Sequence, residues 1–203
     1  MNDRVKTHYK NLLLKFGDGA ESAQYSSKIT QERRFEMLMK IADLEGASIL
    51  DFGCGSASFA AYLMGKNVNF KYTGVDIVEE FFDVARKKSP NESRFGLLEE
   101  FEHEKFDYIF VSGVFNNKRR DNRAFYQSTI KTLFGMCLKG MAFNMMSTYV
   151  DYRDEGLFYE SPEKAFSFVK KELTPYVQLR HDYEVKDGVI PFEFAIYAYK
   201  MSV

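Results

Sequence analysis

The chain has 203 residues, enough to bury a core and few enough for a single domain. Its residues are 45% hydrophobic and 28% charged, which is typical of an ordinary globular protein. A formal net charge of −1 gives no general attraction to nucleic acid or to a membrane surface, so we expect neither as a partner. We interpret the local basic run at Lys118, Arg119, Arg120 and Arg123 as the solvent-exposed start of a helix.

The cysteines and the apolar runs further limit the class of protein to which the chain can belong. Cys54 and Cys137 are the two cysteines, too few for a disulfide framework or a cysteine metal cluster. Residues 1–10 lack the apolar core of a signal peptide. No apolar run reaches the roughly 18–20 residues that span a bilayer. The sequence therefore predicts a soluble, cytoplasmic protein.

The first 45 residues carry two helical patterns, over 8–16 and about 30–44, joined by a polar loop that contains glycine. Thr30 is the expected cap of the second helix. These helices either cover one edge of a sheet or form a lid with Tyr25, Gln31 and Arg34 pointing inward, and the sequence leaves both interpretations open.

Strand-like and helical stretches alternate from there onward. Strands are predicted over 47–52, 70–76, 93–98, 106–112 and 140–146, and helices over 56–64, 78–88, about 121–137 and 162–173. Such alternation indicates a parallel sheet with helices on both faces. The last two strands, 176–183 and 192–199, have no helix between them and are joined by an Asp187-Gly188 turn, so they must be antiparallel. The predicted fold is α/β: a doubly wound, mostly parallel seven-stranded sheet with a C-terminal antiparallel hairpin strand.

The most informative stretch runs from Ile49 to Phe59 and reads I-L-D-F-G-C-G-S-A-S-F. A buried strand, a glycine turn and a helix in this order form a nucleotide-binding cradle. The dinucleotide pattern G-x-G-x-x-G fails, because Ser58 holds the place of its third glycine. The stretch instead resembles the first motif of class I S-adenosylmethionine-dependent methyltransferases, (D/E)-x-G-x-G-x-G. Asp51, Gly53 and Gly55 match this motif, and Ala57 replaces its last glycine at a helix start, where we expect a methyl group to be tolerated.

The whole chain also resembles a group of small bacterial single-domain methyltransferases. The resemblance lies in I-L-D-F-G-C-G, S-G-V-F-N, A-F-N-M-M-S, and the closing R-H-D-Y and F-E-F-A-I-Y segments. It implies one Rossmann-like methyltransferase domain over 1–203, with a helical lid at 1–45 and the core at 46–203. It further implies S-adenosylmethionine as the cofactor, a small-molecule methyl acceptor and a monomer or homodimer. No metal is expected, because no carboxylate cluster follows the fourth strand.

Asp76 is the expected ribose ligand. It ends the second strand 25 positions after Asp51, near the offset of about 20 residues for a ribose-binding acid, and a carboxylate can accept hydrogen bonds from both ribose hydroxyls. The alternative is a capping box with Glu79 at the start of the next helix. Ile77 would offer an apolar surface to adenine.

The resemblance assigns the remaining cofactor contacts. Asp51 supports the turn and the amino-acid end of the cofactor, unless it serves the glycine turn alone. Leu98 stands near the place where the family usually delivers an acid or amide to adenine. Arg34 is the expected cation for the cofactor carboxylate, with a solvated arginine as the alternative. Within and beyond the glycine turn, the expected contacts are Phe52, Gly53, Cys54, Gly55, Ser112 and Gly113.

The acceptor side is predicted from side-chain chemistry. A hydroxyl or ammonium acceptor needs a base, and His181, which closes the penultimate strand, is the candidate. Asp182 points to the opposite face of the strand and cannot orient it, so a backbone-bonded histidine is the alternative. Asn116 and Tyr25 complete the expected catalytic set. Further acceptor-side candidates are Asn144, Tyr149, Tyr152 and Tyr159.

The predicted function is S-adenosylmethionine-dependent methylation of a hydroxyl or amine on a polar small molecule, such as a sugar or a surface-polysaccharide precursor. Two alternatives stay open: a non-catalytic cofactor-binding or partner-binding protein on the same fold, and another nucleotide-cofactor enzyme. Methylation of nucleic-acid bases is disfavoured, because Ser112–Asn116 stands where an N-P-P-Y or D-P-P-Y motif would be.

Overall fold

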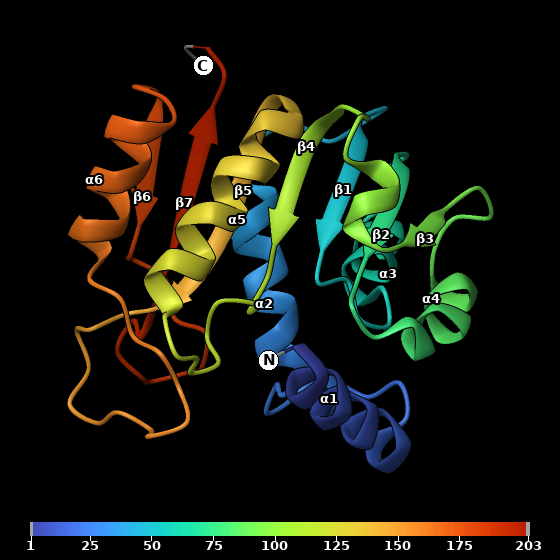
Figure 1. The fold of residues 1–203 in the computed structure, drawn as a ribbon, viewed down its shortest axis with the longest axis horizontal. Helices are drawn as coiled ribbons and strands as arrows, with labels where there is room; N and C mark the ends of the chain where they lie inside the picture. The colour runs from blue at the N-terminus through green and yellow to red at the C-terminus, as the bar shows by residue number, and fades with distance from the viewer. Residues whose placement is uncertain (1, 202–203) are drawn as a thin grey trace.

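The computed structural model describes residues 2–201, and the side chains of residues 5–201. One seven-stranded sheet runs through the molecule in the order β3-β2-β1-β4-β5-β7-β6 (Figure 1). β7 is antiparallel to both of its neighbours, and the other pairs are parallel. This is the Rossmann-like methyltransferase arrangement that the sequence predicted. The strands are β1 Ser48–Phe52, β2 Lys71–Val75, β3 Arg94–Gly96, β4 Phe106–Val111, β5 Cys137–Met146, β6 Val177–Arg180 and β7 Glu193–Tyr199.

Helices cover both faces of the sheet. One core layer packs under α2, α3 and α4, and includes Phe35 and Phe59. The opposite layer packs under α5 and α6, and includes Ile130 and Val169. The α-helices are α1 Asn2–Phe16, α2 Lys28–Met39, α3 Ser58–Gly65, α4 Phe82–Lys88, α5 Asn122–Met136 and α6 Pro162–Glu172, and the short 3-10 helices are η1 Ala20–Ala23, η2 Glu79–Phe81 and η3 Leu98–Phe101.

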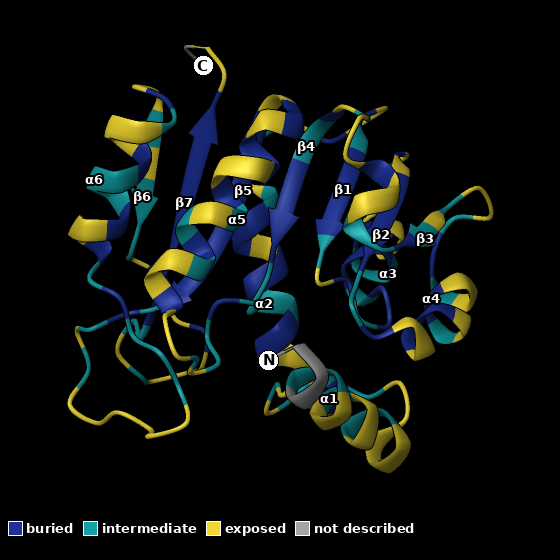
Figure 2. Cartoon of the chain, viewed as in Figure 1, coloured by how far each residue is buried: buried dark blue, intermediate teal, exposed yellow. Residues whose placement is uncertain are grey.

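Central strands are almost continuously apolar because both of their faces are covered. Ile49 and Leu50 of β1 are fully buried, and every residue of β7 is buried. Figure 2 shows this buried sheet with helices whose outer faces are exposed. α1 lies apart from the two layers, beyond the ends toward which β1 and β4 point (Figure 1). No helix among residues 2–201 is long and apolar enough to cross a membrane.

Three of the predicted helices have different boundaries. The helix expected over 8–16 begins at Asn2, six residues earlier. The cap of α2 is Ser27, whose side chain accepts a hydrogen bond from the Thr30 amide, so Thr30 is not the cap. The helix ends at Met39, and the apolar spacing continues through tighter turns in which amides bond to carbonyls three residues back. The helix expected over 78–88 is divided into η2 and α4.

Strand ends also differ from the predictions. β5 begins at Cys137, three residues earlier than expected, directly after α5. β6 ends at Arg180, so His181, Asp182 and Tyr183 lie outside the strand. The predicted antiparallel pairing of the last two strands is confirmed, and Gly188 in their connection has a φ of +67°.

Candidate functional site

A cavity of about 280 Å³ opens at the carboxyl ends of β1, β2 and β4. This edge is where open α/β sheets bind ligands. The cavity brings together most of the residues that the sequence singled out. Its lining includes Tyr25, Asp51, Phe52, Gly53, Cys54, Gly55, Asp76, Ile77, Leu98, Ser112 and Gly113. Arg34, Asn116 and His181 are not part of its lining.

The glycine turn after β1 forms the floor of this cavity. Gly53 and Gly55 have φ values of +77° and +49°, which favour glycine. A Cβ on Gly53 would overlap Val114. The amides of Gly53 and Cys54 both donate to the carbonyl oxygen of Val75, which holds the turn against β2.

Ala57 departs from the expectation of an ordinary helix start. It is fully buried and precedes α3 with a φ of +55°, in the left-handed region. The motif has glycine at this position because glycine adopts a positive φ without steric strain. Alanine takes this conformation at a cost of roughly 1–2 kcal/mol.

Asp76 is held in place by two backbone amides. Its Oδ2 accepts from the Gly55 amide at 2.9 Å, and its Oδ1 accepts from the Val78 amide at 2.9 Å. Burial raises the pKa of the carboxyl, which these amide donors partly offset. No capping box forms with Glu79, since the next helical turn has no side-chain cap. Each carboxylate oxygen keeps a lone pair for a ligand hydroxyl.

Asp51 is a buried carboxyl whose pKa lies near neutral pH. Burial raises its pKa to about 7, the Tyr72 hydrogen bond lowers it, and the charge of Asp76 raises it. The Tyr72 hydroxyl donates to Asp51 Oδ2 at 2.6 Å. A cationic group arriving in the cavity would therefore favour the ionised form.

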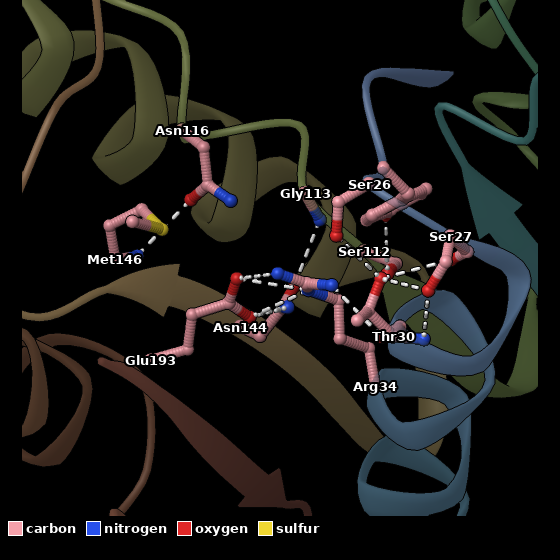
Figure 3. A network of polar contacts seen from close by, with 11 residues as sticks. Ser26, Ser27, Thr30, Arg34, Ser112, Gly113, Asn116, Asn144, Met146 and Glu193 are labelled. Carbon is pink, nitrogen blue, oxygen red and sulfur yellow. Dashed lines mark hydrogen bonds and ion pairs between the residues drawn. The ribbon is translucent and has the colours of Figure 1, made fainter. Parts of the chain in front are cut away.

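A ring of contacts supports the loop after β4, and the Arg34–Tyr25 contact closes it; its members are Tyr25, Ser112, Gly113, Asn144, Glu193 and Arg34. Figure 3 shows the polar network around Asn144 and Glu193. Asn144 Oδ1 accepts from the Gly113 amide at 2.9 Å, and Asn144 Nδ2 donates to Glu193 at 2.8 Å. The Tyr25 hydroxyl lies 3.0 Å from Ser112 Oγ. Burial raises the pKa of Tyr25 to about 12, so its hydroxyl is protonated at neutral pH.

Arg34 belongs to this ring, which corrects the expectation that it holds the cofactor carboxylate. Its guanidinium forms a buried ion pair with Glu193 and donates to the Thr30 carbonyl at 2.9 Å. It also lies over the Tyr25 ring, at 4.9 Å from the centroid. The arginine is thus neither solvated nor directed into the cavity, because a carboxylate of the chain already pairs with it.

His181 and Asn116 take structural contacts outside the cavity. His181 Nε2 lies 3.1 Å from the Pro191 carbonyl oxygen, which is the backbone-bonded alternative. Asn116 Oδ1 accepts from the Met146 amide at 3.1 Å. Among the other acceptor-side candidates, Asn144 is buried in the ring above. The remaining three are not in the cavity lining: Tyr149, Tyr152 and Tyr159.

The sequence missed a second wall of the cavity. This wall comes from α1 and from the segment between β4 and α5, and it contains Tyr9, Asn117, Arg119 and Phe125. The side-chain nitrogen of Asn117, Nδ2, donates to the Tyr9 hydroxyl at 2.7 Å, which ties α1 to that segment. Arg119 belongs to the basic run interpreted above as solvent-exposed. No periodicity marks a loop residue as facing a cavity, so the sequence carried no signal for this wall.

Comparison with known proteins agrees with this geometry. Residues 50–129 match a family model described as a methyltransferase domain. No curated protein sequence matches the chain. The matched segment contains the glycine turn, Asp76 and the loop after β4.

Solved methyltransferases share the fold across almost the whole chain. Magnesium protoporphyrin IX methyltransferase (ChlM) from Synechocystis PCC 6803, with bound SAH, has a TM-score of 0.62 and 12% identity, covering 85% of this chain and 84% of its own. The DhpI–SAH complex has a TM-score of 0.62 and 13% identity, with 98% and 94% covered. The plantazolicin methyltransferase BpumL, in complex with SAH and a triazolic desmethylPZN analog, has a TM-score of 0.61 and 12% identity, with 98% and 97% covered. At identities this low, the similarity to these structures shows the fold alone.

Proposed function

We propose that the chain is a class I S-adenosylmethionine-dependent methyltransferase that methylates a hydroxyl or amine of a polar small molecule, such as a sugar or a surface-polysaccharide precursor. The observation that carries the proposal is the Asp76 carboxylate, fixed by two amides inside the cavity at the end of β2. S-adenosylmethionine, when bound, supplies an electrophilic methyl group on a sulfonium. The similar ChlM, DhpI and BpumL structures, each crystallised with SAH, support this cofactor.

The residues present fit such a cofactor. Asp76 would accept hydrogen bonds from the ribose hydroxyls, and Ile77 and Leu98 offer apolar surface to adenine. Asp51 provides a carboxyl for the cofactor ammonium at the opposite end. Ser112 and Gly113 would lie beside the sulfonium.

The protein would contribute mainly alignment and exclusion of water. Holding two reactants in line lowers a barrier by up to ~7–11 kcal/mol in favourable cases. Tyr25 is the one member of the expected catalytic set in the cavity. With a pKa raised to about 12 it is no base at neutral pH, so we assign it the positioning of the acceptor through its hydroxyl. His181 and Asn116 would meet the acceptor only if that molecule extends beyond the cavity.

Calorimetric titration of S-adenosylmethionine and SAH tests this function. Wild type should bind both in the micromolar range, and Asp76→Ala should weaken binding at least tenfold, about 1.4 kcal/mol, through loss of the ribose ligand. Asp83→Ala is the matched control, because Asp83 is an exposed carboxylate on α4 that pairs with Arg86. Its affinity should equal that of wild type. Absence of binding by wild type would contradict the proposal.

A further inference from the structure

Arg119 presents a cation to the same cavity from the wall formed by the segment between β4 and α5. It lies between β4 and α5, and its amide donates to Asn122 Oδ1 at 2.8 Å, which fixes the backbone. Its guanidinium stacks on Phe125, 4.0 Å from the ring centroid. The side chain is half-buried and lines the cavity. A stacked arginine loses little further entropy on binding a ligand, because its planar group is already oriented.

The charge of Arg119 is not neutralised within residues 5–201. Two other arginines without an ion pair among the described side chains, Arg120 and Arg153, are exposed. The arginines that pair with carboxylates are Arg33, Arg34, Arg86, Arg94, Arg123 and Arg180. Arg119 takes part in none of the ion pairs among the described side chains, and its buried Nε has no hydrogen-bond partner. Burial lowers the pKa of this guanidinium, with the Tyr9 hydroxyl as a partial offset. An unpaired, partly desolvated cation is costly unless a ligand pairs with it.

The neighbouring basic residues do not share this position. Arg120 and Lys118 are exposed, and Arg123 pairs with the buried Glu160 at 2.7 Å. Of this basic run, Arg119 alone lines the cavity. A general basic surface would expose all of these side chains to solvent, whereas Arg119 is stacked on Phe125 and lines the cavity.

The two walls of the cavity belong to opposite faces of the sheet. Tyr72, the partner of Asp51, is in the core layer of α2 and α3. Phe125, the partner of Arg119, packs on the layer of α5. If Asp51 holds the amino-acid end of the cofactor, as proposed above, the cofactor carboxylate lies on the Asp51 side. An anion that pairs with Arg119 would then belong to a molecule other than the cofactor.

We propose that Arg119 binds a carboxylate or phosphate of the methyl acceptor, which makes the acceptor an anionic small molecule. This inference rests on the proposed function. Guanidinium groups bind both anions through paired N–H donors. Asn117 and Tyr9, linked at 2.7 Å, form the adjoining polar part of the wall.

Arg119→Met removes the charge and leaves an unbranched apolar side chain beside Phe125, and Arg120→Met is the matched control from the exposed part of the same run. SAH should bind wild type and both variants within about twofold, because Arg119 does not touch the cofactor. A tenfold weaker affinity in Arg119→Met alone would overturn the inference, since the guanidinium would then contact the cofactor.

Anion binding is measured next on the SAH-saturated protein. Inorganic phosphate and acetate are titrated at constant ionic strength, and the arginine Nε–H resonances are followed by NMR. We expect one resonance to shift saturably in wild type and in Arg120→Met, and to be missing in Arg119→Met. No saturable shift with either anion would overturn the inference. Failure of SAH to bind wild type would instead overturn the proposed function, and the same titrations of the cofactor-free protein would then decide the anion site independently.

Discussion

At the scale of single residues, Asp51 illustrates how burial sets a group's chemistry. Its carboxyl is buried, and its pKa is raised to about 7, although Tyr72 donates a hydrogen bond to it. The folded state therefore keeps a proton that the unfolded state releases near pH 4. As far as this group contributes, the free energy of unfolding falls as pH rises from about 4 to 7.

Cofactor binding should depend on pH with the opposite sign. If Asp51 pairs with the cofactor ammonium, the ionised carboxylate is required. Affinity for SAH should then rise as pH increases through about 7, by about tenfold between pH 6 and pH 8 if only the ionised form binds. Calorimetry at a series of pH values measures this, and Asp51→Asn should flatten that part of the profile. An identical slope in the variant would assign the pH dependence to another group.

At the scale of elements, the Arg34–Glu193 pair joins α2 to the first residue of β7. Glu193 is fully buried and also accepts a hydrogen bond from Asn144, which in turn holds the Gly113 amide (Figure 3). α2 and the loop after β4 thus depend on one buried carboxylate. The segment that the sequence offered as a lid or an edge cover contributes Tyr25 and Gln31 to the cavity.

Glu193→Gln should be strongly destabilising. It leaves the buried guanidinium of Arg34 without its counter-charge, which typically costs about 3–5 kcal/mol. Glu104→Gln is the control, because Glu104 pairs with Arg94 at the surface, where such pairs contribute about 0–1 kcal/mol. Urea unfolding followed by circular dichroism compares the two free energies. Similar losses in both variants would show that burial does not distinguish these ion pairs.

At the scale of the whole molecule, the described side chains of α1 attach it through Tyr9, which is hydrogen-bonded to Gln24 and Asn117, and through surface ion pairs. Val5 and Tyr9 line the cavity, whereas Lys6 and Lys10 pair with Glu79 and Glu80 at partly or fully exposed positions, 3.6 and 2.7 Å apart. Surface ion pairs of this kind stabilise little. A ligand in contact with Val5 and Tyr9 would therefore add to what holds α1.

Hydrogen exchange should report this dependence. On saturation with SAH, backbone amides of α1 should exchange more slowly, because binding lowers the population of states in which the helix is detached. α6 is the internal control, since it lies at the far end of the sheet and lines none of the cavity. Equal changes in the two helices would indicate general stabilisation, and no change in α1 would show that it does not close over the ligand.

Much of the fold follows from local signals. Alternating apolar runs and helical spacings predicted the seven strands, and the missing helix between the last two runs predicted their antiparallel pairing. The helix predicted over 162–173 is confirmed as α6, with Ser161 as its cap and Pro162 at its first position. The left-handed backbone of Ala57 was not foreseen, because a conformation is decided by the turn in which the residue lies rather than by its type.

The sequence by itself determined the methyltransferase-like fold and the glycine turn after Asp51, with Asp76 at the end of the next strand, because these features follow a regular strand–turn–helix order. Tertiary structure decided the roles of the arginines. Arg34 and Glu193 meet across 159 residues, and Arg119 reaches the cavity only because β4 and α5 place its loop there. A charge becomes paired or free according to what folding brings beside it, and no local pattern in the sequence records that neighbour.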